Sequence, residues 1–434
     1  MVGKAREAAL EALERCRRSG SWSAESIDSV INKYDLDSRD AALATHICLG
    51  TLQNLALCDY RIDELSKSKI EPKVRDVLRT AVYQLMFMDR IPSNAAVFEA
   101  VRLCKHLGYG RAAGFVNALL RKVAKDRESM PDIPGKGSAE YLSIRYSHPK
   151  WLADLMIREH GYDFAEAFFA SNNDVPKTYI QVNTLKTDAA ALKKRLEDQG
   201  VEVAAHEWLS SCLCVSGNIS AMPGFAEGLF YVQDPAARLA VTIAQLAPGQ
   251  KVLDACAAPG GKSFAAAIDM ENRGSILSCD IHEKKLELIR SGAERLGIDI
   301  IKTQAADARQ SRGEVFDTVI ADVPCSGLGV IRKKPEIRFK SSEEISTLPS
   351  VQLEILENLS ECVVPGGVLI YSTCTVLSAE NECVVRDFLK KHDEFESVPF
   401  ALPHGFEAVS GMYTFWPNVD GTDGFFAAKL WRKA

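Results

Sequence analysis

The sequence predicts an α/β domain at its C-terminal end, with an open parallel sheet covered by helices, after an all-helical region and a small α+β region. From residue 249 onward, apolar runs of strand length alternate with stretches of helical periodicity, as in parallel α/β folds. Residues 1–130 carry apolar residues three and four positions apart, which is the spacing of amphipathic helices. Residues 139–240 mix short alternating segments with a helical stretch, which predicts a separate mixed region.

The helical region is predicted to end in a short linker. One buried helix face is marked by apolar residues at helical spacing: Val74, Leu78, Ala81, Leu85 and Met88. Ser38 is expected to cap a helix over residues 39–57, because its hydroxyl can accept a bond from the first turn. Residues 130–138 (MPDIPGKGS) have the turn-forming composition of a domain boundary. We therefore expect three domains, over residues 1–130, 139–240 and 241–434.

Strands and helices of the later regions follow from the same patterns. In the mixed region, the alternation predicts a strand over residues 179–183 and a helix over 188–199, with short strands near 201–204 and 212–215. In the C-terminal region, strands are expected near 251–256, 275–280, 317–323, 367–374, 411–416 and 424–431. Helices are expected between them, near 261–270, 283–296, 343–361 and 379–391.

The composition is that of an ordinary globular protein. Of 434 residues, 47% are hydrophobic and 25% are charged, and no run of about 18 apolar residues occurs, so no membrane partner is expected. The N-terminal residues lack the apolar stretch of a signal peptide. The 12 cysteines are therefore expected to be reduced thiols in the cytoplasm. No Cys-x-x-Cys pair is present, so we expect no structural zinc and no other metal.

Charge is distributed unevenly along the chain. The net charge of −6 argues against a protein that binds nucleic acid with its whole surface. Residues 1–130, however, carry 21 Lys and Arg against 17 Asp and Glu, so the rest of the chain is acidic. Within that rest, residues 331–340 (IRKKPEIRFK) have five basic residues and one acid. Such a run alone is most simply a solvated loop, but its position shortly after Cys325 favours a segment that contacts phosphates.

A glycine turn after the first predicted strand of the α/β region has the features of a ligand site. Asp254 ends this strand, and Gly260 and Gly261 allow backbone to approach a ligand closely. The turn matches neither the GxGxxG nor the GxxxxGK[ST] pattern, which weakens dinucleotide and nucleoside-triphosphate interpretations. Asp280 ends the next strand, where a carboxylate can accept both hydroxyls of a ribose, and Asp307 ends the following segment, where it could bind an adenine amine. Any one acid could be a loop cap, but three at successive strand ends predict an adenosine pocket.

Two cysteines lie at the ends of later predicted strands. Cys325 follows Asp322 in DVPCSGLG, and Cys374 ends YSTC, so both should emerge at the same sheet edge as the glycine turn. Either cysteine alone could be a packing residue, as we expect for Cys256 and Cys279 beside the ligand site.

A pair at one edge next to a cofactor turn suits pyrimidine chemistry. A thiolate that adds to C6 of cytosine turns C5 into a carbon nucleophile able to accept a methyl group. Asp322 could supply a proton to N3 if its pKa were raised, and Lys262 next to the glycine turn could face the reacting groups.

At these residues the chain resembles the RNA cytosine-5 methyltransferases of the NOL1/NOP2/Sun class, and within it the 16S ribosomal RNA branch. The segments that carry the resemblance are DACAAPGGKS at 254–263, DVPCSGLGVIRKKPEIRF at 322–339, YSTCTVLSAENE at 371–382 and DGFFAAKL at 423–430. SHPKW at 147–151 and YVQDPAA at 231–237 also look like family sequences, and residues 1–130 resemble a NusB-like helical RNA-binding domain. The resemblance implies a Rossmann-like class I methyltransferase domain after the NusB-like domain and a small α+β RNA-binding subdomain.

The resemblance also implies roles for individual residues. In the family, the cysteine of the Thr-Cys motif is the nucleophile and that of the Pro-Cys motif aids product release; here these are Cys374 and Cys325. Residue spacing alone does not decide between the two. The contacts to S-adenosyl-L-methionine that carry over are Cys256, Ala257, Ala258, Pro259, Gly260, Gly261, Lys262, Asp280, Asp307 and Asp322.

The implied partner is 16S ribosomal RNA, free or partly assembled, bound by a monomer. Two departures stand out: Gln181 precedes Val182-Asn183 where relatives often have a basic residue, and Ala306 precedes Asp307 where they often have glycine. The alternatives are a transfer RNA methyltransferase of the same chemistry, a non-catalytic NusB-like RNA-binding protein, and a protein-glutamine methyltransferase. The last would be expected to have an Asn-Pro-Pro-Tyr type motif where Asp322-Val323-Pro324-Cys325 stands.

Overall fold

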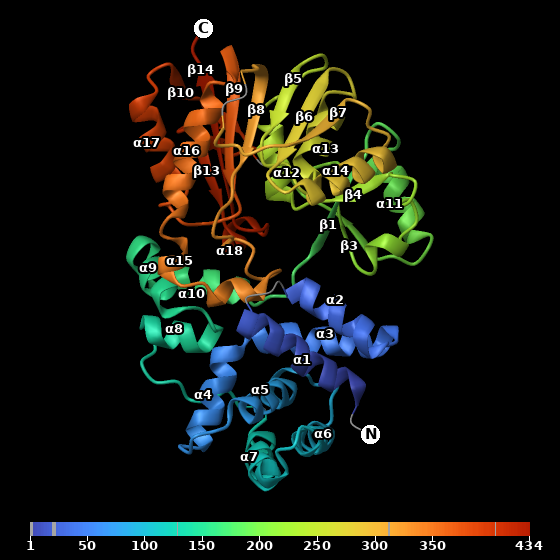
Figure 1. Ribbon diagram of the computed structural model, residues 1–434, viewed down its shortest axis with the longest axis vertical. Helices are drawn as coiled ribbons and strands as arrows, with labels where there is room; N and C mark the ends of the chain where they lie inside the picture. Colours follow the sequence, from blue (N-terminus) through green and yellow to red (C-terminus); the bar gives the residue numbers. More distant parts are fainter. Residues whose placement is uncertain (1–2, 20–22, 128, 311–312, 404) are drawn as a thin grey trace. The chain divides into compact units, whose positions relative to one another are not determined.

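The chain divides into two compact units. The structure, a computed structural model, describes residues 3–19, 23–127, 129–310, 313–403 and 405–434. The first unit comprises Met1–Asp174 and the separate segment Ile331–Ser342, and the second comprises Val175–Val330 and Glu343–Ala434. Each is described by itself below, with the element labels of Figure 1. The three-domain division expected from the sequence stays a prediction.

The first unit is built of helices around one apolar core. Its helices are α1 Lys4–Ser19, α2 Ser23–Tyr34, α3 Ser38–Gln53, α4 Leu55–Leu65, α5 Pro72–Phe87, α6 Ser93–His106, η1 Gly110–Ala112, α7 Ala113–Lys125, α8 Ala139–Tyr146, α9 Lys150–His160, α10 Tyr162–Ser171 and η3 Pro335–Phe339. All five residues of the predicted apolar face on α5 and just after it are buried, which confirms that prediction. They pack in one cluster with Leu13, Ile47 and Leu120 from α1, α3 and α7.

The start and the end of α3 differ from the prediction. Asp37, not Ser38, is the N-cap, and its carboxylate accepts the backbone N–H of Asp40 at 2.8 Å. The helix ends at Gln53 because Asn54 leaves the helical conformation and its side-chain amide donates to the carbonyl of Gly50 at 2.9 Å. No single helix in the described part of the chain is long and apolar enough to cross a membrane; the α3–α4 pair, bent by 76°, could do so by length and composition only.

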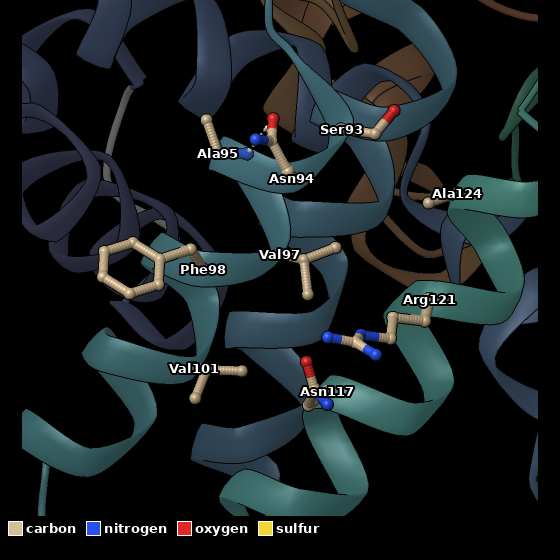
Figure 2. Close-up of a pocket in the computed structure, with 9 residues that line it drawn as sticks. All are labelled: Ser93, Asn94, Ala95, Val97, Phe98, Val101, Asn117, Arg121 and Ala124. Atoms are coloured by element: carbon tan, nitrogen blue, oxygen red, sulfur yellow. Dashed lines mark hydrogen bonds between the residues drawn. The ribbon is translucent and has the colours of Figure 1, made fainter.

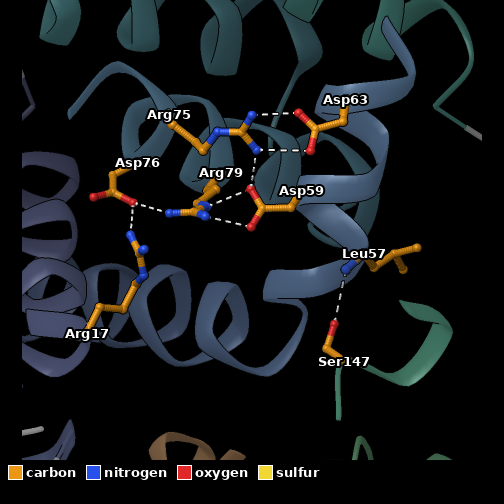
Figure 3. A network of polar contacts seen from close by, with 8 residues as sticks. All are labelled: Arg17, Leu57, Asp59, Asp63, Arg75, Asp76, Arg79 and Ser147. Atoms are coloured by element: carbon orange, nitrogen blue, oxygen red, sulfur yellow. Dashed lines mark hydrogen bonds and ion pairs between the residues drawn. The ribbon is translucent and has the colours of Figure 1, made fainter. Parts of the chain in front are cut away.

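Ion pairs join α4 to α5 (Figure 3). The Arg79 guanidinium donates to Asp59 at 2.6 Å and to Asp76 at 2.7 Å, and Arg75 binds both Asp59 and Asp63. Asp76 is only 2% exposed, so its charge depends on these arginine partners. The network therefore fixes the register of the two helices, in addition to the apolar contacts beneath it.

Arg338 departs from the expectation that residues 331–340 contact phosphates, while for the other basic residues of this segment the expectation stays a prediction. The Arg338 side chain is buried within the first unit, and its two terminal nitrogens donate to backbone and side-chain oxygens of that unit. The acceptors are the carbonyls of Gln53, Tyr146, Ser147 and Asn172 and the side-chain oxygen of Asn173, at 2.6, 3.0, 3.3, 3.0 and 2.6 Å. Both terminal nitrogens of its guanidinium are therefore bound to protein oxygens rather than presented to a ligand, while its Nε is buried without a partner among the described residues.

The position of Arg338 has a simple electrostatic basis. Its carbonyl partners come from the last residues or C-caps of α3, α8 and α10, so three helix C-termini converge on one cation. Carbonyls at a helix C-terminus lack partners in the helix and carry the negative end of its dipole. Burial lowers the pKa of Arg338 to about 9, which leaves the guanidinium charged at neutral pH. One side chain thus satisfies the ends of three helices.

Arg338→Leu should destabilise the first unit, because it removes a buried charged donor from several oxygens. The carbonyls of Tyr146 and Asn172 keep other donors, whereas those of Gln53 and Ser147 lose the donor that Arg338 supplies. We expect a loss of about 3 kcal/mol in the free energy of unfolding, as is typical when a buried charged partner is removed. Thermal unfolding followed by circular dichroism measures the effect, and Arg90→Leu, at an exposed arginine of the same unit, is the matched control. Equal unfolding temperatures for the two variants would contradict this role for Arg338.

The second unit begins with a small antiparallel sheet. Its strands are β1 Thr178–Val182, β2 Val203–Ala205, β3 Cys212–Val215 and β4 Phe230–Val232, in the order β2-β3-β1-β4, with α11 Ala189–Glu197 and η2 Ile219–Ala221. Apolar side chains of β1, β3 and β4 pack on Leu192 and Leu196 of α11. The predicted strands and helix of this region are present, while β4 was not predicted.

The large sheet of the second unit is mostly parallel (Figure 1). Its strands are β5 Lys251–Asp254, β6 Ser275–Asp280, β7 Ile301–Ala305, β8 Phe316–Asp322, β9 Val363–Thr373, β10 Phe395–Ser397, β13 Met412–Phe415 and β14 Phe425–Arg432. The order is β10-β14-β9-β8-β5-β6-β7, with β13 on β14. The strand order reverses between β5 and β8, and in such sheets ligands bind beyond the carboxyl ends of the strands at that point.

Helices cover both faces of this sheet, which buries alternate residues of each strand on opposite sides. The helices are α12 Pro235–Thr242, α13 Gly261–Asp269, α14 Glu283–Leu296, α15 Ser342–Ile345, α16 Leu348–Ser360, α17 Glu382–Lys391 and α18 Pro417–Asp420, and a short hairpin joins β11 Phe400–Ala401 to β12 Glu407–Ala408. Leu253 of β5 packs in the cluster that includes α16 and α17, whereas its neighbour Val252 packs with α13 and α14. The predicted α/β sheet is confirmed, and α12, β7 and β10 are additions to it.

Candidate active site

The glycine turn connects the centre of the sheet to α13. Gly260 has φ +112°, a conformation that other residues rarely adopt, and a Cβ there would lie 2.6 Å from the ring of Phe264. Within the turn, the Ala257 N–H donates to the carbonyl of Cys279 on β6 at 2.7 Å, and the Gly260 N–H donates to Ala257 at 2.7 Å. The turn is therefore held against the end of β6.

Asp254, at the end of β5, lies beneath this turn. One carboxylate oxygen accepts the Ser263 hydroxyl at 2.6 Å, while the other is buried without a hydrogen-bond partner among the described residues. Burial raises the pKa of Asp254 to about 7, although the Ser263 hydrogen bond and the charge of Lys262 act in the opposite direction. A buried oxygen without a partner and a proton gained near neutral pH are features of functional sites.

The two further acids predicted for an adenosine pocket follow the next strands. Asp280 ends β6; its carboxylate accepts the N–H groups of His282 at 2.9 Å and Ala258 at 3.3 Å, so it is fixed against the glycine turn. Asp307 follows β7 and is paired with Arg309 at 2.7 Å. Parallel pairing aligns Asp280 with Ala305, which puts both acids at the carboxyl edge of the sheet.

The two strand-end cysteines lie side by side. Parallel pairing of β8 with β9 aligns Asp322 with Ser372, so the residues that follow both strands leave the sheet together. The sulfur of Cys325 lies 3.3 Å from that of Cys374, and both side chains are partly buried. The shared edge predicted from the strand pattern is what the structure has.

The environment of Cys325 disfavours its thiolate form. The hydrogen bond with Cys374 raises the pKa of Cys325, and burial and the charges of Glu380 and Asp322 raise it further. The raised pKa favours the protonated form of Cys325. Either sulfur can donate in this contact, and where Cys325 donates, the Cys374 sulfur accepts.

An ion pair lies next to the cysteines. The Lys262 ammonium is 2.7 Å from one oxygen of Asp322, and the Ser372 hydroxyl donates to the other at 2.9 Å. Lys262 also lies over the ring of Phe425, 5.0 Å from its centre. Both Asp322 oxygens thus accept hydrogen bonds, which fix the orientation of the carboxylate.

Several residues that hold the cysteine loops were not found from the sequence. The Glu380 carboxylate accepts the Ser326 N–H at 2.8 Å and the Gln352 side-chain amide at 2.9 Å, and Gln352 also donates to the carbonyl of Pro324. The Ser326 and Thr375 hydroxyls are 2.8 Å apart, linking the two loops directly. Glu380 lies in the AENE segment quoted above, but no spacing rule indicates that it supports a loop 54 residues away.

Other predicted residues surround the turn. Cys256 is partly buried within it and Cys279 is fully buried on β6, as packing residues would be. Ala258 and Pro259 form the outer part of the turn, where Pro259 is exposed. In the described part of the chain, no group of three or more His, Cys, Asp and Glu side chains could hold a metal ion.

Comparison with known proteins agrees with this geometry. The model of the family "16S rRNA methyltransferase RsmB/F" matches residues 241–431, the NusB family matches 3–125, and an RsmF/B-like ferredoxin-like domain matches 148–221. A Bacillus subtilis protein named "probable ribosomal RNA small subunit methyltransferase B" is 34% identical over 99% of this chain and 98% of its own. The chain belongs to the ribosomal RNA small subunit methyltransferase B (RsmB) family.

Other relatives extend this result. The Vibrio cholerae ribosomal RNA small subunit methyltransferase B is 32% identical over 90% of this chain and 89% of its own. The crystal structure of PH0851 is 30% identical, covers 99% of both chains and has a TM-score of 0.82. The resemblance drawn from the motifs is confirmed, and so is the fold it implied: a NusB domain, a small ferredoxin-like α+β domain and a Rossmann-like methyltransferase domain.

Asp254→Asn should change the pH dependence of stability. Between about pH 4 and 7 the folded protein holds a proton on Asp254 that the unfolded chain releases, so this group makes folding less favourable as pH rises. The variant lacks this effect. Its unfolding temperature relative to wild type should therefore rise across that interval and level off above pH 7. The corresponding change in the free energy of unfolding is at most about 4 kcal/mol.

Thermal unfolding at a series of pH values measures this difference. Asp393→Asn, at an exposed acid of the same unit, should show no such rise. A constant difference between Asp254→Asn and wild type from pH 4 to 8 would mean that Asp254 is ionised in the folded protein.

Proposed function

We propose that the protein transfers a methyl group from S-adenosyl-L-methionine to C5 of a cytosine in 16S ribosomal RNA, of the cytosine-967 type. The observation that carries the proposal is the pair of strand-end cysteines with sulfurs 3.3 Å apart beside the Lys262–Asp322 ion pair. Membership of a family whose relatives are named as small-subunit ribosomal RNA methyltransferases supports the RNA substrate.

Cys374 is the proposed nucleophile. Its thiolate adds to C6 of the cytosine, forming the C6–S bond, and the electron pair of the C5–C6 double bond becomes available at C5. The hydrogen bond from the Cys325 thiol supports this assignment, because it lowers the cost of negative charge on the Cys374 sulfur. The Thr-Cys motif of the family assigns the same residue.

The Lys262–Asp322 pair is the proposed proton source for the base. Addition at C6 places negative charge on N3, which needs a hydrogen-bond donor or a proton. Lys262 carries the proton and Asp322 is bound to it at 2.7 Å, so transfer through the pair can supply N3. Ser372 holds the other Asp322 oxygen and keeps the carboxylate in position.

Cys325 is proposed to act when the product leaves. After methylation, C5 loses its proton to water and the C6–S bond breaks, so that negative charge returns to the Cys374 sulfur. The Cys325 S–H can donate a hydrogen bond to that sulfur as it departs, because the two atoms are already 3.3 Å apart. The two cysteines therefore have different tasks at one place.

The residues around the glycine turn fit the cofactor. Asp280 offers carboxylate oxygens to ribose hydroxyls, and Asp307 to an adenine amine. The buried Asp254 oxygen without a partner among the described residues lies beneath the turn and is consistent with a nearby donor or positive charge. The turn from Cys256 to Lys262 would line the rest of the site. When bound, the cofactor supplies an electrophilic methyl group on a positively charged sulfur.

The target cytosine must leave its stack to react. C6 is attacked from above the ring plane, which a neighbouring base covers in a stacked strand. An unstacked base in a loop or at a helix end satisfies this requirement, and RNA shape then selects the site. The helical domain and residues 139–240 are the proposed RNA-binding parts.

Cys374→Ala should abolish methylation, whereas Cys325→Ala should accumulate a covalent RNA adduct. The first change removes the attacking thiolate, and the second removes the donor that assists departure of the Cys374 sulfur. Methyl transfer to a 16S ribosomal RNA transcript measures the first effect, and a slowly migrating band on a denaturing protein gel measures the second.

Cys362→Ala, at a buried cysteine at the start of β9 and away from the pair, is the control and should do neither. Full activity of Cys374→Ala would exclude it as the nucleophile. An adduct trapped by Cys374→Ala rather than by Cys325→Ala would exchange the two roles.

Asp280→Ala should weaken cofactor binding by about tenfold or more, since a charge-assisted hydrogen bond to a ribose contributes about 1.5–3 kcal/mol. Calorimetric titration of the full chain with S-adenosyl-L-homocysteine measures the affinity directly. Asp393→Ala is the control, because Asp393 is an exposed acid outside this site. Unchanged affinity in Asp280→Ala would contradict the ribose contact.

A further inference from the structure

A groove lies on the helical unit between α6 and α7 (Figure 2). Its volume is about 610 Å³, which is within the usual range of small-ligand sites. The residues that matter for its chemistry are Asn94, Val97, Phe98 and Val101 from α6, and Asn117 and Arg121 from α7. We call it the α6–α7 groove.

An aromatic ring at the groove is open to solvent. Phe98 is 59% exposed, which is unusual for a phenylalanine, while Val97 next to it is buried and forms the floor. The Arg102 guanidinium lies 5.3 Å from the centre of the Phe98 ring and pairs with Glu99 at 2.9 Å, so the ring already stacks with a planar cation. The exposed ring offers a stacking surface to a planar ligand.

Polar groups with unused hydrogen-bonding capacity point into the same groove (Figure 2). Among the described residues, neither the Asn117 amide nor the Arg121 guanidinium has a hydrogen bond or an ion pair. The Asn94 carbonyl oxygen accepts the N–H of Ala95 at 3.0 Å, which leaves its amide nitrogen available. By contrast Arg127, which follows α7, donates to the carbonyls of Met88 and Ile91 and therefore has a structural role.

The charge around the groove is positive. Arg111, Lys122 and Lys125 are exposed, and within the described ranges none of them makes an ion pair. The nearby acid Glu99 is already bound to Arg102 and to the backbone N–H of Gly3. A polyanion would therefore be attracted to this face without displacing an existing ion pair of Arg121.

We propose that the α6–α7 groove is a subsite for one unstacked nucleotide of the RNA substrate. The base stacks on Phe98, the amides of Asn94 and Asn117 bind its edge, and the Arg121 guanidinium binds a flanking phosphate. Aromatic stacking with amide and arginine donors is the usual chemistry for single-stranded RNA. The inference rests on the proposed function for the identity of the RNA, and it places a contact on the helical unit, away from the reacting cysteines in the sequence.

RNA is favoured over a protein helix as the occupant. The lining is mostly apolar, as a groove for a protein helix would also be, but Asn94, Asn117 and Arg121 add donors that a base edge and a phosphate require. The open cations on α7 complement phosphates, which every RNA segment carries. A free nucleotide could use the same contacts, and the competition experiment below distinguishes it from RNA.

Binding of a fluorescently labelled single-stranded RNA of about 12 nucleotides to the full chain tests the subsite. Phe98→Ala and Arg121→Gln should each weaken binding about tenfold, as loss of one stacked base or one phosphate contact does. Arg121→Gln should also reduce the slope of log affinity against log salt by about one. Phe98→Tyr keeps a ring and should retain wild-type affinity.

Lys122→Gln is the matched comparison for Arg121→Gln and should weaken binding by less, because Lys122 adds to the positive charge of this face but does not line the groove. It removes the same charge from the next residue of α7, which points about 100° around the helix and does not line the groove. Equal losses in both variants, or affinities equal to wild type in Phe98→Ala and Arg121→Gln, would overturn the subsite. Adenosine and cytidine monophosphates should not compete at concentrations that leave the RNA bound, and effective competition would assign the groove to free nucleotides instead.

Two readouts separate this inference from the proposed function. If wild type binds the RNA and the groove variants lose affinity while no small-subunit ribosomal RNA is methylated, the subsite stands and the proposed reaction fails. If wild type methylates 16S ribosomal RNA and the groove variants bind and methylate it with unchanged affinity and KM, the subsite fails and the reaction stands. If Phe98→Ala weakened binding of a protein partner and left RNA binding unchanged, the RNA subsite would also be rejected.

Discussion

The parallel pairing of β8 with β9 is the constraint on which the candidate active site depends. Alignment of Asp322 with Ser372 means that Cys325 and Cys374 follow the two strands within a few residues of the same sheet edge. The loops after the strands continue this pairing, since the Gly329 N–H donates to the carbonyl of Cys374 at 3.0 Å. A slip of one residue would turn every side chain of β8 to the opposite face and separate the pair.

Electrostatics then distinguishes groups of similar type. Asp254 is buried, and burial raises its pKa to about 7, whereas Asp322 at the next strand end is held by Lys262 and Ser372. The two cysteines also differ, because the contact with Cys374 and burial raise the pKa of Cys325. One sheet edge thus brings together two carboxylates, an ammonium group and two cysteines, each in a different environment.

The sequence predicted the parts whose signal is local. Apolar runs located β5, β6, β8 and β9, and the glycine turn and strand-end cysteines located the site, because side chains at strand ends in a parallel sheet share an edge. β7 was missed because its residues (IKTQA) are largely polar and partly exposed, and α12 because eight residues carry little periodicity. β9 begins at Val363, earlier than the predicted residue 367, because Pro365, Gly366 and Gly367 lie within the strand although they are poor strand formers.

Contacts between residues far apart in the chain could not be predicted from the sequence. Nothing local indicates that Glu380 accepts the N–H of Ser326, or that the ends of three helices converge on Arg338, because these partners are brought together only by folding. Arg338 is the clearest case. A basic run typical of a phosphate contact contains a buried structural arginine, and charge counting alone does not separate the two.

The most direct test of the account is to identify the sulfur that bonds to the RNA. A 16S ribosomal RNA fragment with 5-fluorocytidine at the methylated position stalls the reaction, because fluorine cannot leave C5 as the proton does. Mass spectrometry of the digested wild-type complex then locates the modified peptide. The account predicts a pyrimidine bonded to Cys374 and an unmodified Cys325. Attachment to Cys325, or methylation of the ordinary RNA with no adduct on either cysteine, would contradict it.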